Sequence, residues 1–234
     1  MEMTDIALAA VWYVILLIAL VFHEFAHSFA ALKLGDPTAY QSGQVTLDPI
    51  PHIRREPFGT VIVPIISYFA AGWMIGWASA PYDPFWARQY PRKAALMALA
   101  GPAANLALVT VAALIIRAGM LLGFFHAPDA IGFTTVTAAT AGGLANAVAV
   151  VVSILFSLNL ILMVFNLIPL PPLDGSSVLL GLLKGEAAER YYTVMSTPGY
   201  RIIGLIIAWH IFGYVLRPVH LLAINLLYPE VGYG

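Results

Sequence analysis

The sequence contains no cysteine and few charged residues. Without cysteine the chain can form neither disulfides nor thiolate metal sites, so any metal ion must be bound by histidine, carboxylate or water. Charged residues make up 10% of the chain and the formal net charge is -1, which gives no support to nucleic-acid binding. Internal repeats and low-complexity linkers are also absent from the sequence.

Hydrophobic residues, by contrast, make up 61% of the chain, and the mean hydropathy is +0.86. These values are typical of a multi-pass membrane protein and exclude an ordinary soluble domain. A membrane-spanning helix needs about 20 consecutive apolar residues. The long apolar stretches are 6–34, 94–116, 138–165 and 202–216, the last prolonged past Pro218 by 219–228. We therefore expect the lipid bilayer to surround the protein.

The segments between the long stretches predict smaller elements. Region 58–80 is apolar but contains Pro64, Gly72 and Gly76, which predicts a re-entrant or broken segment. Residues 44–47 alternate between polar and apolar, so we expect a small extended or hairpin segment near 42–48. A short helix is expected after Asp174. The predicted fold class is an all-α polytopic membrane protein with about four full transmembrane helices and these additions.

The first apolar stretch carries the motif HEFAH at residues 23–27. Two histidines four residues apart lie on one face of a helix, where their rings can hold a single metal ion. Glu24 follows the first histidine directly, so it can stand beside the ion as a general base without binding it. The motif favours a metallopeptidase. Because the stretch lacks a basic start and carries this motif, we expect it to be retained rather than cleaved as a signal peptide.

A five-residue motif also arises by chance, but its setting here argues against accident. Residues 6–22 before it are all apolar, and a charged residue within a bilayer costs about 2.5 to 3.5 kcal/mol. Three ionisable groups in such a position favour a functional site. His210 also lies within an apolar stretch, and for it we expect a neutral histidine bonded to a neighbouring helix.

Two further motifs follow in chain order, AGPAAN at 100–105 and NLIPLPPLDG at 166–175. Together with HEFAH they resemble the catalytic core of the site-2 protease family of intramembrane zinc metallopeptidases. No PDZ-like insertion is visible, so the chain is similar to the compact subgroup that lacks one. We therefore expect a single membrane-embedded metalloprotease domain over 1–234, with its catalytic core at about 6–175.

The resemblance implies a role for each residue of the metal site. His23 and His27 would bind one zinc ion, Glu24 would act on the attacking water, and Asp174 would be the third ligand. Two histidines and a carboxylate also meet the requirement of catalytic zinc for three protein ligands and one open position. The alternative for Asp174 is an N-cap of the short helix that follows it.

The resemblance also implies which residues handle the substrate: Asn105, Asn166, Pro169 and Pro171. The substrate would be a transmembrane segment of another protein, which must unwind locally before a peptide bond is exposed. Residues 45–47 could receive the unwound segment by β-addition. Ser79 and Ser177 stand where basic residues are common in the family, which affects substrate preference rather than metal binding.

Other functions stay open at this point. One is a different type of membrane metallopeptidase, against which the pattern Pro-x-Pro-x-x-Asp-Gly argues. Another is a non-catalytic metal-binding scaffold or a transporter, which should show more intramembrane carboxylates than Glu24 and Asp174.

The orientation in the membrane follows from the metal site. Asp174 must lie at the depth of the two histidines, and stretches 94–116 and 138–165 supply the two crossings this requires. With the positive-inside rule, the active site is then expected near the cytoplasmic side of a cell membrane.

Overall fold

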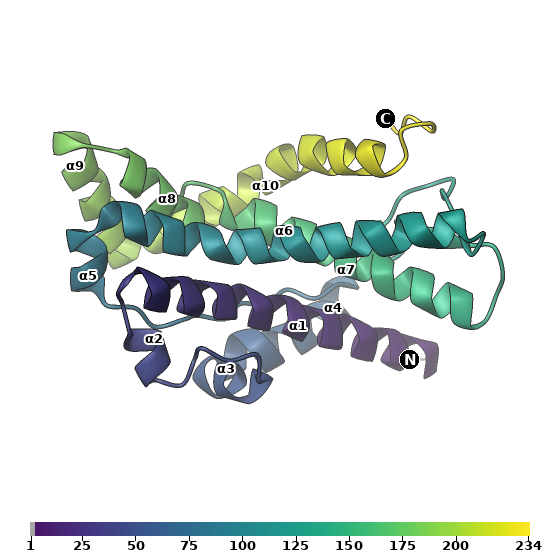
Figure 1. Ribbon diagram of the computed structural model, residues 1–234, viewed down its shortest axis with the longest axis horizontal. Helices are drawn as coiled ribbons and strands as arrows, with labels where there is room; N and C mark the ends of the chain where they lie inside the picture. Colours follow the sequence, from purple (N-terminus) through teal and green to yellow (C-terminus); the bar gives the residue numbers. More distant parts are fainter. Residues whose placement is uncertain (1–2) are drawn as a thin grey trace.

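The computed structural model describes residues 3–234, and among these residues four helices are long and apolar enough to cross a membrane (Figure 1). They are α1 (Met3–Leu34), α6 (Pro91–Leu121), α7 (Leu144–Asn166) and α10 (Pro198–Leu227). The predicted all-α polytopic fold class with about four transmembrane helices is confirmed.

Helices α1, α6 and α7 pack against one another and form the centre of the molecule (Figure 1). Small residues on α6 are buried in these contacts, and small residues let helices approach closely in a membrane. Apolar side chains of α1 and α7 also meet in one buried cluster, whose members include Trp12, Leu16, Leu20, Ile154 and Leu158. The bundle therefore holds α1 firmly along most of its length.

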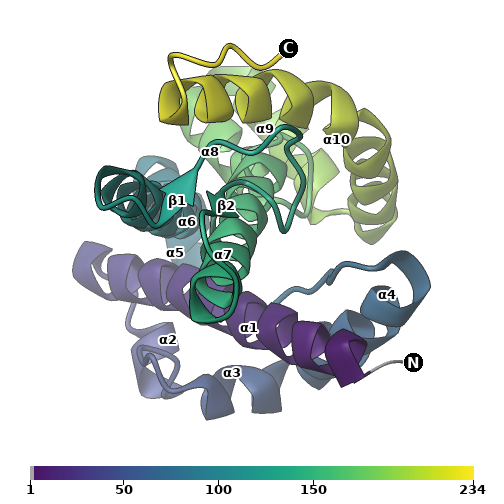
Figure 2. The same cartoon turned by 90° about the vertical axis from the view of Figure 1, so that its right-hand side faces the viewer.

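Helix α10 lies on the opposite side of the molecule from α1, with α6 and α7 between them (Figure 2). It packs on α7 and on α9 (Gly185–Ser196). In its most apolar window 11% of the residues are buried, compared with 61% for α7. As expected, α10 continues through Pro218. Helix α9 forms in the polar stretch after residue 184.

The predicted broken segment at 58–80 is confirmed. It consists of a π-helical turn, η1 (Phe58–Ile62), followed by α4 (Val63–Ala71). The helix ends at Gly72, which has a left-handed φ of 78° that favours glycine. The chain then turns back, and the Trp77 N–H donates to the Gly59 carbonyl at 3.0 Å. A Cβ atom on Gly59 would overlap Trp77, so the close return depends on glycine there.

The predicted hairpin near 42–48 is wrong. Residues 42–48 form turns and bends between α2 (Thr38–Gln41) and α3 (Pro49–Arg55). Their polar groups bond locally: the Asp48 side chain accepts from the Ile50 N–H, and the Thr46 hydroxyl accepts from the Asp48 N–H. A strand needs a partner for its ladder, and these local bonds replace one. The segment therefore offers no preformed strand edge to a substrate.

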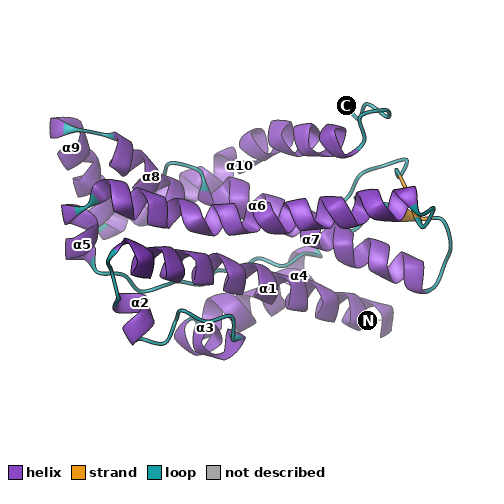
Figure 3. Cartoon of the chain, viewed as in Figure 1, coloured by secondary structure: helices purple, strands orange, loops and turns teal. Residues whose placement is uncertain are grey.

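The two-stranded sheet of the described residues lies elsewhere, at the end of the molecule where α6 and α7 are joined (Figure 3). Strand β1 (Phe125–His126) pairs with β2 (Ala138–Ala139) in antiparallel register. Helix α7 therefore starts at Leu144 rather than at 138 as predicted. Residues 138–139 belong to the sheet, and Gly143, with φ 71°, turns the chain into the helix.

The predicted short helix after Asp174 is confirmed as α8 (Asp174–Leu182), which packs on α6. At the same end of the molecule, α5 (Pro84–Gln89) precedes α6, and an Arg88 to Glu189 ion pair of 3.6 Å links α5 to α9. Because α8 packs on α6, its first residue, Asp174, lies next to the central bundle.

Candidate metal centre

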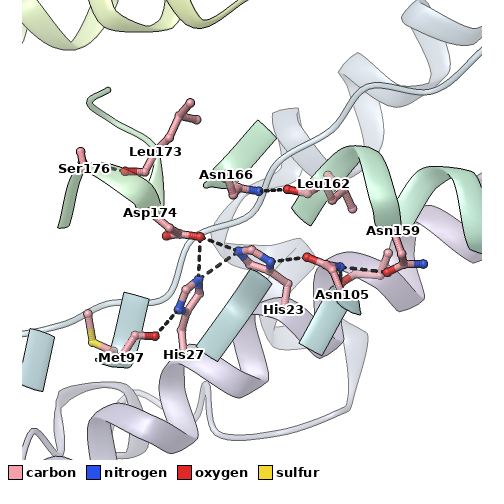
Figure 4. A network of polar contacts seen from close by, with 11 residues as sticks. His23, His27, Met97, Asn105, Asn159, Leu162, Asn166, Leu173, Asp174 and Ser176 are labelled. Atoms are coloured by element: carbon pink, nitrogen blue, oxygen red, sulfur yellow. Dashed lines mark hydrogen bonds and ion pairs between the residues drawn. The ribbon is translucent and has the colours of Figure 1, made fainter. Parts of the chain in front are cut away.

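Three metal-ligating side chains converge between α1 and α8 (Figure 4). His23 and His27 face the same way from consecutive turns of α1, and their Nε2 atoms are 2.9 Å apart. The Asp174 Oδ2 atom lies 3.2 Å from Nε2 of His23 and 3.3 Å from Nε2 of His27. Both histidines are buried, and Asp174 is partly buried. The predicted grouping of these three residues is therefore present in the fold.

The donor set fits a zinc ion. Zinc bonds to histidine nitrogen and carboxylate oxygen of about 2.0 to 2.2 Å place tetrahedral ligand atoms about 3.3 Å apart, close to the separations found here. The Asp174 Oδ2 atom is buried and has no hydrogen-bond partner among the described residues, although it points between two ring nitrogens. A carboxylate oxygen that faces two ring nitrogens at this distance and makes no hydrogen bond is well placed to share a cation with them.

The alternative in which Asp174 caps α8 is wrong. Leu173 occupies the N-cap position, and no side chain caps the helix. The Ser176 hydroxyl donates to the Leu173 carbonyl instead, at 2.6 Å. Burial disfavours the charged carboxylate, but the imidazoles of His27 and His23 outweigh this effect and hold the pKa of Asp174 well below its ordinary value. The Asp174 carboxylate is therefore not engaged by the helix and is directed at the two histidines.

The outer ring nitrogens of both histidines also have partners. His27 Nδ1 lies 2.8 Å from the Met97 carbonyl oxygen, and His23 Nδ1 lies 2.6 Å from Oδ1 of Asn105. Asn105 is completely buried. Metal-binding histidines characteristically donate their second N–H to an oxygen in this manner. The resemblance grouped Asn105 with the substrate, whereas the structure brings it into contact with His23 of the candidate metal site.

Gly101 on α6 is a site residue that sequence reasoning did not single out. A Cβ atom at this position would overlap Nε2 of both His23 and His27, so both rings require a glycine there. The available signal was its place in the AGPAAN motif at 100–105, from which only Asn105 was assigned a role. Close backbone approach at a functional site is a recognised use of glycine.

Glu24 is buried, with 4% of its surface exposed, yet its carboxylate makes no hydrogen bond or ion pair with any described residue. A buried carboxylate is normally paired. Glu24 directly follows His23 and interacts electrostatically with His27, so its position suits the general base predicted from the motif.

Three of the expected substrate residues lie on the chain between the end of α7 and Asp174. Asn166 is the last residue of α7, and its Nδ2 donates to the Leu162 carbonyl at 3.0 Å (Figure 4). Pro169 is exposed, and its carbonyl accepts a hydrogen bond of 2.9 Å from the Tyr191 hydroxyl. Pro171 is buried beneath α10, where its carbonyl would overlap a Cβ atom on Gly204.

Two histidines outside the site differ in their surroundings. His52 is buried, and its Nε2 lies 3.0 Å from the Thr46 carbonyl oxygen. His210 is exposed on α10 and makes no hydrogen bond or ion pair with a described residue. The expected bond from His210 to a neighbouring helix is therefore wrong, because that face of α10 has no neighbouring helix within the described chain.

Comparison with known proteins gives the same assignment as the geometry. The family model for peptidase family M50 matches residues 11–207. YwhC of Bacillus subtilis is 31% identical over 205 residues, which cover 87% of this chain and 83% of YwhC. Rip2 of Mycobacterium tuberculosis is 33% identical over 172 residues, which cover 73% of this chain but 56% of Rip2. Both relatives carry a provisional designation as zinc metalloproteases. No solved structure matches this chain significantly.

Proposed function

Because the chain belongs to peptidase family M50 and is therefore an intramembrane zinc metalloprotease, we propose that His23, His27 and Asp174 hold one zinc ion and that Glu24 is the catalytic base. The observation that carries the proposal is the position of Asp174 Oδ2. This oxygen is buried, makes no hydrogen bond, and lies between the Nε2 atoms of His23 and His27. The site thus has three protein ligands, as catalytic zinc requires.

The chemistry divides between the ion and the side chains. When bound, zinc supplies a Lewis acid that polarises the scissile carbonyl and makes water more acidic. Glu24 accepts the proton that the attacking water loses and returns it to the amine that leaves. Its lack of any hydrogen bond or ion pair within the described chain leaves both carboxylate oxygens free for this transfer.

We propose that the substrate is a transmembrane segment of another membrane protein. Such a segment hides its peptide groups in helical hydrogen bonds, so it must unwind to be cut. The stretch of chain from the end of α7 to Asp174 contains Asn166, Pro169 and Pro171. We assign these three residues to holding the unwound segment. The Asn166 amide nitrogen is already bonded to Leu162, which leaves its carbonyl oxygen to accept from a substrate N–H.

Separating zinc binding from cleavage tests this function. Glu24→Gln is expected to keep the metal and abolish cleavage, whereas Asp174→Ala is expected to lose both. Metal analysis of purified protein and quantitative proteomics of membranes with wild-type or Glu24→Gln protein provide the two measurements. Full zinc and full turnover in Asp174→Ala would show that the third ligand is misassigned.

We further propose that the metal centre lies near the cytoplasmic side. Nine of the eleven basic residues would then face the cytoplasm: Lys33, Arg54, Arg55, Arg88, Arg92, Lys93, Lys184, Arg190 and Arg201. In support, Lys93 donates to the carbonyl of Leu34 at the end of α1, whereas Arg117 donates to the carbonyl of Leu227. The chain has no cysteine, so a single cysteine at Gln89 can be labelled selectively. Labelling from outside intact cells would overturn this orientation.

A further inference from the structure

A line of buried amides connects α7 to the metal-binding face of α1 (Figure 4). Asn159 on α7 donates from Nδ2 to the Leu155 carbonyl at 2.8 Å. Its Oδ1 accepts from Nδ2 of Asn105 on α6 at 2.9 Å. Asn105 Oδ1 in turn lies 2.6 Å from Nδ1 of His23. Asn105 and Asn159 are both fully buried, so water cannot replace these bonds.

The direction of every hydrogen bond in this line is determined at its start. A backbone carbonyl can only accept, so Asn159 must turn its NH2 group toward Leu155 and its oxygen toward Asn105. Asn105 must then present its NH2 group to Asn159, and the same group also reaches the Ala19 carbonyl at 3.4 Å. Its oxygen is left facing His23. Since that oxygen only accepts, His23 must carry its proton on Nδ1.

We propose that Asn105 and Asn159 are positioning residues that hold His23 as the Nδ1–H tautomer, with the lone pair of Nε2 directed at the metal. This inference rests on the proposed function of the site. His27 obtains the same tautomer directly from the Met97 carbonyl. Among the described residues the acceptor at Nδ1 of His23 is the Asn105 side chain, so His23 obtains this tautomer through two amides. Asn105 therefore acts on the metal ligand, and Asn159 acts through Asn105.

Removing the hydrogen bonds from Asn159 through Asn105 has two effects on His23. An Nδ1–H without an acceptor is unfavourable in a buried site, so the ring shifts toward the Nε2–H tautomer, which has no free lone pair on Nε2 for the metal. The ring also loses the contact that holds its orientation. Removal of such an outer partner typically weakens metal binding about 10-fold to 100-fold.

Asn105→Leu and Asn159→Leu test the proposal, with Asn225→Leu as a matched control. Asn225 is an asparagine of α10 that donates to the Tyr233 carbonyl, away from the metal centre. Zinc affinity is measured by chelator competition on full-length protein in bilayers. The tautomer of His23 is measured in metal-free protein from the ring nitrogen NMR shifts, assigned by comparison with His23→Ala.

We expect zinc affinity to fall about 10-fold to 100-fold in Asn105→Leu and by a smaller factor in Asn159→Leu, with the control unchanged. The His23 shifts should move from Nδ1–H toward a mixture of tautomers in both variants. Asn105→Asp keeps an acceptor for His23 but cannot donate to Asn159, so the His23 shifts should stay closer to Nδ1–H than in Asn105→Leu. A merely structural role would lower stability and leave the tautomer unchanged.

Two outcomes would overturn the inference, and both are distinct from failure of the proposed function. Unchanged zinc affinity in Asn105→Leu, or an Nδ1–H tautomer that persists in both leucine variants, would show that the amides do not position His23. If Asn105→Leu does not fold, Asn159→Leu decides through the same tautomer measurement. Absence of zinc binding in the wild-type protein would instead refute the metal site itself.

Discussion

Helices α1 and α10 are both long and apolar and both carry histidine, yet His23 and His27 of α1 have surroundings opposite to those of His210 on α10. On α1, His23 and His27 are buried and every ring nitrogen has a neighbour. On α10, His210 is exposed and has no hydrogen-bonding partner in the described chain. An ionisable residue in an apolar helix is thus a strong indication of function only where another helix brings partners to it.

The difference follows from what packs against each helix. Helix α1 is pressed against α6, where Gly101 leaves room for two imidazole rings, and α8 brings Asp174 to the same place. Helix α10 has large apolar side chains on its exposed surface, including Ile202, Ile206, Trp209 and Tyr214. Such a surface suits lipid contact, and a histidine within it gains no polar environment.

The largest expected effect tests this contrast directly. His23→Ala should lose zinc and reduce cleavage to background, because one of three ligands is gone. His210→Ala should retain zinc and activity and change stability by about 0.5 kcal/mol or less. Metal content, cleavage and thermal unfolding measured on both variants decide the point. Loss of zinc or activity in His210→Ala would break the comparison.

A glycine pair sharpens the same contrast. Gly101→Ala should displace both imidazole rings, and a misplacement of about 1 Å can cost about a hundredfold in rate. Gly213 on α10 has nothing within 4 Å of the corresponding Cβ position, so Gly213→Ala should leave cleavage unchanged. Zinc affinity and kcat/KM are the measurements. Equal effects of the two substitutions would mean that the crowding at Gly101 is not functional.

Asn166, at the end of α7, is expected to show a smaller effect. Asn166→Ala should bind zinc normally and lower kcat/KM about tenfold, the equivalent of one substrate hydrogen bond of about 1.5 kcal/mol. Partial recovery is expected with a substrate whose helix is weakened by glycines. Equal loss on rigid and weakened substrates would refute the substrate contact and leave only its bond to the Leu162 carbonyl.

The smallest effect is expected at Tyr191 of α9, whose hydroxyl donates to the Pro169 carbonyl near the site. Tyr191→Phe removes one partly exposed hydrogen bond, worth about 1 kcal/mol. Activity should fall by a few-fold at most, with zinc affinity unchanged. A large loss of zinc in this variant would show that α9 controls the metal centre. The environment of the α1 histidines would then depend on more than α6 and α8.

Local patterns predicted some elements and failed at others for identifiable reasons. The long helices and the break at Gly72 followed from hydropathy and from residues that end helices. The hairpin near 42–48 did not form, because alternation describes one chain and a strand also needs a partner. Here the side chains of Thr46 and Asp48 bond to their own neighbourhood instead.

The candidate site shows the same division. His23, Glu24 and His27 are recognisable because helical periodicity places them together whatever the rest of the chain does. Asn105 was assigned to the substrate from a motif alone. Its contact with His23 joins residues that are 82 positions apart, a separation at which no local pattern operates.

The sequence alone determined a membrane protein whose first helix presents two histidines one turn apart, with a glutamate directly after the first, and a carboxylate at Asp174. These properties depend on side-chain hydrophobicity and on hydrogen bonds within single helices, which are local. Only the tertiary structure decided that Asp174 Oδ2 lies between the two Nε2 atoms, that Gly101 makes room for the rings, and that Asn105 meets Nδ1 of His23. Those contacts join α1, α6 and α8, and they exist because packing brings separate helices within bonding distance.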